Sequence, residues 1–175
     1  MVIIGETIHV ISKSVSDAIK ERSPKPIQDL AIDQAKAGVD YIDLNLGPAR
    51  RDPEGTMQWL VSAVQEVIDL PLSLDTMNSI AMEAGLKICK KRPLLNSASA
   101  RTDSKEQMLP LAKKYNCDVV ISVITDQGCP PGVDARVESI MGTVALANEL
   151  GIPNEDIWVD PILLPVSANQ TEVKE

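Results

Sequence analysis

Short apolar runs alternate with longer segments of helical periodicity along the whole chain. The apolar runs carry few polar residues, which is typical of parallel strands whose two faces are covered by helices. The predicted strands are Val2–Glu6, Tyr41–Asn45, Leu72–Asp75, Leu94–Ser97, Val119–Val123 and Ile157–Asp160. A strand–helix order that repeats to a sixth strand predicts the α/β fold class.

Helix signals stand between these strands. The predicted helices are Ser14–Glu21, Pro26–Ala37, Pro53–Ile68, Ile80–Lys90, Lys105–Tyr115 and Asp134–Leu150. Asp52 is the expected N-cap of the third helix, because Pro53 follows it at the first helical position. Either Asn78 or Ser79 is expected to cap the fourth helix, and either Asp103 or Ser104 the fifth. These caps place each helix start a few residues after a strand.

A polar residue stands at or near the carboxyl end of each predicted strand. These residues are Glu6, Asn45, Asp75, Asn96, Ser122 and Asp160. Functional residues gather at that end of the strands in a TIM (β/α)8 barrel, whereas no GxGxxG fingerprint of a dinucleotide-binding sheet follows any strand. Such barrels need about 250 residues, and this chain has 175. We therefore expect one domain over residues 1–175, with about six β/α units and without strands seven and eight.

The charge balance narrows the class of function. The chain carries 25 Asp and Glu against 17 Lys and Arg, a formal net charge of −8, which argues against binding nucleic acid or a membrane surface. No apolar run approaches the ~18 residues that cross a bilayer, and no basic segment marks a secretory signal. The three cysteines show no CxxC spacing, which fits reduced thiols in the cytoplasm and indicates no metal site.

Asp75, Asn96 and Asp160 follow three strands that are far apart in the sequence. In one barrel their side chains would converge on one mouth. Two carboxylates and an amide suit a ligand with adjacent N–H donors, such as a 2-amino-4-oxo pyrimidine edge. Two alternatives stay open here: a hard cation held by Glu6, Asp75 and Asp160, or acids that merely cap the following helices.

Five stretches carry a resemblance to a known family: IIGETI, DYIDLNLGPA, LPLSLDTMN, PLLNSAS and IWVDPILLP. In this order they resemble the pterin-binding barrel superfamily, from Val2 to about Gln170. Within it the chain is most similar to the methyltetrahydrofolate:corrinoid methyltransferases, and less so to the folate domain of cobalamin-dependent methionine synthase and to dihydropteroate synthase. The resemblance implies that Asp75, Asn96 and Asp160 bind the pterin ring, with Asn45 and Ser122 as further candidates at the mouth.

The resemblance also implies a reaction. The family transfers a methyl group between N5 of a tetrahydrofolate and the cobalt of a corrinoid, and N5 must be protonated when it is the leaving group. The chain has no DxHxxG signature of a cobalamin-binding domain, so we expect the corrinoid to be carried by a partner protein. We also expect a homodimer in the cytoplasm.

Two departures from the family pattern bear on catalysis. The family places an Asn after strand seven that meets the N5 region, and the chain ends before that strand, so no catalytic residue is assigned. The family often has ERING or EKING where this chain has ETIHV. His9 therefore stands near the mouth with a side chain that can exchange protons near neutral pH, although a loop histidine without a role is the simpler expectation.

Two alternative functions stay open. Arg50 and Arg51 follow the second strand, where dihydropteroate synthases have an Arg-containing loop that meets a pyrophosphate, so a dihydropteroate synthase-like condensation is one alternative. The basic pair could also be solvated, or could meet the folate tail or the corrinoid protein. The second alternative is a folate-binding fragment without catalytic activity.

Overall fold

The computed structural model describes residues 1–49 and 51–163. The chain forms two compact units. The first comprises Met1–Asn96 with Tyr115–Cys117, and the second comprises Ser97–Lys114 with the described residues from Asp118 onward. None of the helices in these described ranges is long and apolar enough to cross a membrane.

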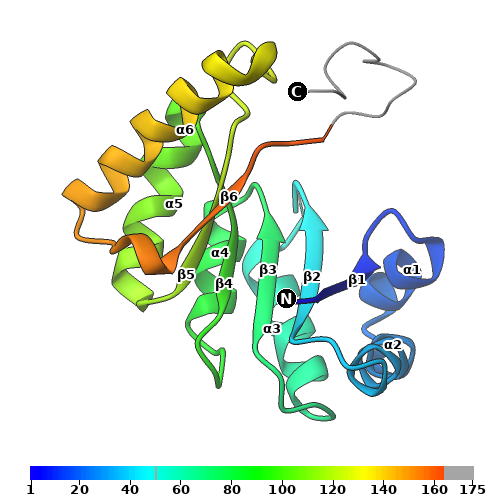
Figure 1. The fold of residues 1–175 in the computed structure, drawn as a ribbon. Coiled ribbons are helices and arrows are strands. Elements are labelled where there is room, and N and C mark those ends of the chain that lie inside the picture. Colours follow the sequence, from blue (N-terminus) through cyan, green and yellow to red (C-terminus); the bar gives the residue numbers. More distant parts are fainter. Residues whose placement is uncertain (50, 164–175) are drawn as a thin grey trace. The chain divides into compact units, whose positions relative to one another are not determined.

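The first unit is built on parallel strands that pair in chain order (Figure 1). The strands are β1 (Ile4–His9), β2 (Tyr41–Gly47), β3 (Leu72–Thr76) and β4 (Leu94–Ser99), the last of which continues into the second unit. The helices are α1 (Lys13–Glu21), α2 (Pro24–Lys36), α3 (Pro53–Gln65) and α4 (Ser79–Leu86). Figure 1 shows α3 and α4 behind the strands of this unit. Apolar residues of both helices are buried, among them Leu60 and Val64 of α3 and Met82 and Leu86 of α4.

The second unit repeats the strand–helix order. It contains most of α5 (Thr102–Tyr115), then β5 (Asp118–Ser122), α6 (Gly132–Glu149), a short 3-10 turn at Asn154–Asp156, and β6 (Ile157–Asp160). β5 and β6 are parallel and in register from Val119↔Ile157 to Ser122↔Asp160. The last strand therefore has the bounds that the sequence predicts.

The helix starts confirm two of the three capping predictions. The Asp52 carboxylate accepts a hydrogen bond from the Gly55 N–H at 3.2 Å. Asn78, rather than Ser79, caps α4, because its Oδ1 accepts the N–H groups of Ile80 and Ala81. Both caps satisfy backbone donors that have no partner within the helix.

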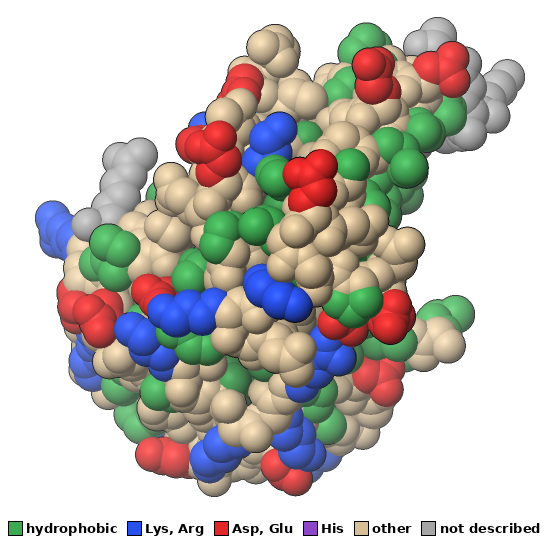
Figure 2. Space-filling view, turned by 90° about the vertical axis from the view of Figure 1, so that its left-hand side faces the viewer, with side chains coloured by type: hydrophobic (Ala, Val, Ile, Leu, Met, Phe, Trp, Pro, Cys, Tyr) green, Lys and Arg blue, Asp and Glu red, His purple; other side chains and the backbone are tan. Residues whose placement is uncertain are grey.

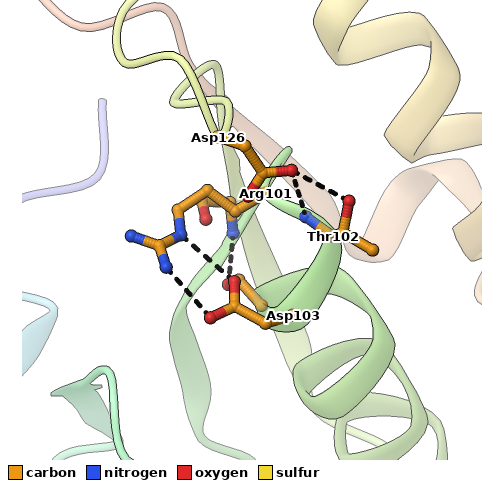
Figure 3. Close-up of polar contacts among 6 residues, drawn as sticks. Arg101, Thr102, Asp103 and Asp126 are labelled. Atoms are coloured by element: carbon orange, nitrogen blue, oxygen red, sulfur yellow. Dashed lines mark hydrogen bonds and ion pairs between the residues drawn. The ribbon is translucent and has the colours of Figure 1, made fainter.

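The predicted start of the fifth helix is wrong. α5 begins at Thr102, so Asp103 and Ser104 lie inside its first turn. The Asp126 carboxylate, from the loop after β5, accepts hydrogen bonds from the Thr102 N–H at 3.3 Å and its Oγ1 at 2.9 Å (Figure 3). Asp103 instead holds the Arg101 guanidinium with two hydrogen bonds. Because the acceptor comes from a distant segment, no local pattern could show it.

The first strand also differs from its prediction. β1 runs from Ile4 to His9, pairing from Ile4↔Tyr41 to His9↔Asn45 with an irregularity between Gly5 and Ile8. Glu6 therefore lies in mid-strand rather than at the strand end. Gly5 allows a close approach of α2, because a Cβ there would lie 2.1 Å from Oε1 of Gln34. This contact seats α2 directly against the strand.

Charged side chains of both signs are distributed over the surface. Figure 2 shows one face of the molecule, on which acidic and basic side chains are interspersed with apolar and neutral ones. Many of the described ion pairs are exposed, such as Lys91 with Asp69 at 2.9 Å. Exposed pairs of this kind contribute about 0–1 kcal/mol each, so the buried aliphatic side chains hold the fold.

Two glycines provide a matched test of the packing of α4 on the sheet. A Cβ at Gly85 would lie 2.7 Å from Cδ1 of Leu74 and 2.8 Å from Cγ of Met57, whereas a Cβ at Gly142 in α6 meets nothing within 4 Å. We expect Gly85→Ala to lower the free energy of unfolding by about 1–2 kcal/mol through overpacking. Gly142→Ala should raise it by about 0.5–1 kcal/mol, since alanine favours the helix. Urea unfolding measures both, and equal stabilisation by the two changes would contradict the tight contact.

Candidate functional site

Three of the predicted site residues lie side by side on adjacent strands. Asp75 is the last but one residue of β3 and Asn45 lies two residues before the end of β2, whereas Asn96 lies in the middle of β4 rather than at the predicted strand end. Asn45 on β2 is in register with Asp75 on β3, and Asp75 is in register with Asn96 on β4. Residues in register on parallel strands direct their side chains to the same face of the sheet. The sheet of the first unit therefore brings Asn45, Asp75 and Asn96 together on one face.

A deeper layer of polar residues supports these three. Asp43 and Ser73 lie two residues earlier on β2 and β3, are in register with each other, and are 3% and 0% exposed. Ser73 Oγ donates a hydrogen bond to Asp43 at 2.5 Å, and Asn96 Nδ2 donates to the same carboxylate oxygen at 3.3 Å. We call Asp43, Asn45, Ser73, Asp75 and Asn96 the polar cluster.

Hydrogen bonds fix the orientation of both amides in the polar cluster. The side-chain oxygen of Asn45 accepts the Gly47 N–H at 2.9 Å, so its NH₂ group is turned to Asp75, to which it donates. The NH₂ group of Asn96 is turned to Asp43, which directs its carbonyl oxygen away from that acid. The Asp75 carboxylate and the Asn96 carbonyl are therefore available as acceptors for a ligand that carries N–H donors.

The two acids of the polar cluster have raised pKa values. Burial raises the pKa of Asp75 to about 7, and the negative charges of Asp43 and Glu6 add to this effect against the hydrogen bond from Asn45. Burial also raises the pKa of Asp43 to about 6, although the hydrogen bonds from Ser73 and Asn96 oppose the rise. A ligand that donates hydrogen bonds would stabilise the ionised form of Asp75.

Asp43 and Ser73 are not among the site residues predicted from the sequence. They lie within strands whose sequences are apolar almost throughout, so the strand-end pattern does not include them. The signal was present in the spacing, because Asp43 and Ser73 each precede a recognised site residue by two positions. Residues two apart on a strand share a face. The two-residue spacing therefore predicts that Asp43 and Ser73 lie on the same face as Asn45 and Asp75.

His9 also belongs to this face of the sheet. It is the last residue of β1 rather than a loop residue, it is in register with Asn45, and it is half-buried. Its imidazole is therefore directed to the same side as the polar cluster, on the neighbouring strand. Register, not the local sequence, decides this placement.

The remaining predicted residues lie in the second unit. Ser122 on β5 and Asp160 on β6 are in register at the carboxyl ends of their strands. Ser122 is 5% exposed, and Oδ1 of Asp160 accepts the Ile162 N–H at 2.9 Å. The structure thus brings Ser122 and Asp160 together as a pair, and their convergence with Asp75 and Asn96 stays a prediction.

Two further observations concern a cysteine thiol and the possible metal ligands of the described residues. Burial raises the pKa of the Cys89 thiol to about 12, with a smaller effect from Cys117, so Cys89 is not a thiolate nucleophile near neutral pH. In residues 1–49 and 51–163, no group of three His, Cys, Asp or Glu side chains is placed to hold a metal ion.

Comparison with known proteins identifies the family. The sequence model of the pterin binding enzymes matches residues 5–174 of the chain. The chain belongs to the pterin-binding enzyme family. It is 31% identical over 169 residues to a methylcorrinoid:tetrahydrofolate methyltransferase of Eubacterium limosum, which covers 95% of this chain and 62% of that protein. The chain thus spans less than two thirds of the length of this relative.

Solved structures confirm the fold of this pterin-binding enzyme chain. The 7,8-dihydropteroate synthase of Vibrio fischeri ES114 superposes with a TM-score of 0.68 at 19% identity, over 92% of this chain and 62% of the other. A dihydropteroate synthase of Xanthomonas albilineans with 4-aminobenzoic acid gives 0.67 at 18%, over 95% and 62%. The α/β class and the TIM (β/α)8-type architecture, with about six β/α units in this chain, are therefore confirmed.

The raised pKa values predict how stability depends on pH. The folded protein holds protons on Asp43 and Asp75 up to pH values of about 6 and 7, whereas the unfolded chain releases them near the ordinary value of 3.8. The contribution of these acids to the free energy of unfolding therefore falls as the pH rises from about 4 to 7. Denaturant unfolding measures this dependence. Across this pH range the free energy of unfolding should fall less steeply in Asp75→Asn than in Asp33→Asn, a control variant that replaces an exposed acid on α2. Equal slopes would contradict the burial of Asp75.

Removal of the Asp43 charge should change the titration of its neighbour. In Asp43→Asn we expect the pKa of Asp75 to fall below about 7, because a like charge is lost while the site stays buried. In Ser73→Ala the pKa of Asp43 should rise, because its carboxylate loses a hydrogen bond. Carbon-13 NMR titration of the carboxyl groups measures both pKa values. An unchanged pKa of Asp75 in Asp43→Asn would rule out an electrostatic interaction between the two acids.

Proposed function

We propose that this chain binds the pterin ring of tetrahydrofolate and takes part in methyl transfer between its N5 atom and the cobalt of a corrinoid. The observation that supports this most directly is the 31% identity to the methylcorrinoid:tetrahydrofolate methyltransferase of Eubacterium limosum. We also propose that a partner protein carries the corrinoid, that this chain forms a homodimer, and that it is located in the cytoplasm.

The polar cluster has the chemistry that pterin recognition needs. The 2-amino-4-oxo edge of a pterin offers adjacent N–H donors from its ring and its exocyclic amine. The Asp75 carboxylate can accept two of them, and the Asn96 carbonyl a third. Asn45 holds Asp75 in place for this contact. We propose that Asp160 and Ser122 also bind the pterin.

The proposed direction of transfer, from a methylcorrinoid to tetrahydrofolate, is that of the reaction in the name of the Eubacterium limosum relative. When a methyl group passes from a methylcorrinoid to tetrahydrofolate, N5 bonds the methyl carbon and releases its proton. The electron pair of the broken carbon–cobalt bond stays on the cobalt. The residues of this chain would orient the pterin so that N5 faces the methyl group, which lowers the entropic cost of the reaction.

A pterin condensation is the competing function. Arg51 follows β2, and a guanidinium there could neutralise a pyrophosphate leaving group. The dihydropteroate synthase structures of Vibrio fischeri and Xanthomonas albilineans are 18–20% identical to this chain, and they share its fold. The third candidate function is folate binding without turnover.

Binding of tetrahydrofolate should depend on Asp75, Asn96 and Asp160. We expect Asp75→Ala, Asn96→Ala and Asp160→Ala each to weaken it by about 1–3 kcal/mol, since each leaves N–H donors of the ligand unpaired. Calorimetry measures the affinity, with Asp33→Asn as the control that removes a charge elsewhere. Unchanged affinity in both Asp75→Ala and Asp160→Ala would refute the pterin site.

Turnover distinguishes the three functions. With methylcobalamin and tetrahydrofolate, we expect the absorbance of methylcobalamin to decay, because the cobalt loses its methyl group. Tetrahydrofolate binding without this decay would leave the chain as a folate-binding protein. Incorporation of 4-aminobenzoate into a pterin product would instead support the condensation.

A further inference from the structure

His9 lies on the face of the polar cluster because the pairing of β1 with β2 changes register. Between the pairs that Gly5 and Ile8 form, three steps along β1 match two along β2. Without this extra residue Ile8, and not His9, would be in register with Asn45. A slip of one residue turns every following side chain to the other face. The register shift therefore places an imidazole, rather than an apolar side chain, beside Asn45, and such irregularities often re-aim a side chain next to an active site.

The backbone around His9 is held in place, whereas its imidazole is not. The His9 C=O accepts the Ser12 N–H at 3.0 Å, and the Val10 N–H donates to the backbone oxygen of Asn45 at 3.2 Å. Within residues 1–49 and 51–163 the ring nitrogens of His9 make no hydrogen bond. The side chain is half-buried. Both ring nitrogens are therefore available to a ligand at this face of the sheet.

His9 is the only basic side chain on strands β1 to β4, all of which the structure describes. Three acids share these strands with it: Glu6, Asp43 and Asp75. Asp43 lies in the deeper layer of the polar cluster and is 3% exposed, and Asp75 meets the N–H donors of the pterin in the proposed function. The bases that remain for a proton of the bound pterin are His9 and the exposed Glu6.

The order of the strands fits a ligand that reaches from the polar cluster to His9. The donor edge of a pterin bound to Asp75 and Asn96 would lie over β3 and β4. Neighbouring strands are about 4.8 Å apart, so β1 is about two such spacings from β3, across Asn45 on β2. A bicyclic ring that is hydrogen-bonded to Asp75 covers most of this distance. Its second ring, which carries N5, would then lie near His9.

We propose that His9 accepts the proton that N5 of tetrahydrofolate releases when the methyl group arrives. This inference rests on the proposed function. The lone pair of N5 forms a bond to the methyl carbon, and the electron pair of the broken carbon–cobalt bond stays on the cobalt. The N5–H bond then breaks, and its proton passes to the unprotonated ring nitrogen of His9, which later gives it to solvent. His9 is a catalytic residue in this step, because it contacts the reacting atom.

Single-turnover methyl transfer from methylcobalamin to saturating tetrahydrofolate tests the inference. We expect His9→Ala and His9→Asn each to lower the rate about 100-fold, as loss of a general base does. Asparagine forms hydrogen bonds but takes up no proton near neutral pH. Both variants should bind tetrahydrofolate within about threefold of wild type, because the polar cluster is intact. Added imidazole should raise the rate of His9→Ala about tenfold and leave that of Asp75→Ala unchanged.

Two further variants separate His9 from general effects of charge. Asp33→Asn, which removes an exposed charge on α2, should keep the wild-type rate. Glu6→Gln removes the other base of β1 and should slow the transfer far less than His9→Asn does. Equal rates in wild type and His9→Asn would overturn the inference. A larger loss in Glu6→Gln than in His9→Asn would overturn it too, since Glu6 would then be the proton acceptor.

A measurement on the wild-type protein tests the contact without a substitution. The chain has a single histidine, so its ring protons give one identifiable set of NMR signals. With 5-methyltetrahydrofolate bound, we expect a nuclear Overhauser effect between the N5 methyl protons and the His9 ring. If the ligand binds and this effect is absent, the inference fails while the pterin site stands. If wild type binds no tetrahydrofolate, or leaves methylcobalamin intact, the proposed function fails and the inference fails with it.

Discussion

The burial of two carboxylates on adjacent parallel strands is the constraint around which the first unit is arranged. Parallel register places Asp43 beside Ser73 and Asp75 beside Asn45 and Asn96. Buried acids of like charge are costly unless hydrogen bonds compensate them. Ser73, Asn96 and Asn45 supply those hydrogen bonds. They do not fully offset the cost of burying the charges, so the pKa values of both acids stay raised.

This arrangement links the stability of the fold to its chemistry. An acid that is costly to ionise in the free protein gains most from a ligand that donates hydrogen bonds to it. Asp75 meets this description. Burial is the main cause of its raised pKa, and the charge of Asp43 beneath it adds to the rise, while Asp43 also orients the Asn96 amide. A pterin edge supplies such donors, so the family to which the chain belongs agrees with what the polar cluster can do.

The sequence alone determined the strand–helix order, the cap at Asp52, a cap at either Asn78 or Ser79, the candidate residues Asn45, Asp75 and Asn96, and the family resemblance, because these depend on local pattern and motif order. Only the tertiary structure decided which side chains meet. The pairing of Asp43 with Ser73, the strand position of His9 and the Asp126 cap on α5 all depend on register or on contacts between distant segments. Such contacts leave no local signature, because the partner is chosen by how strands align and not by neighbours in the chain.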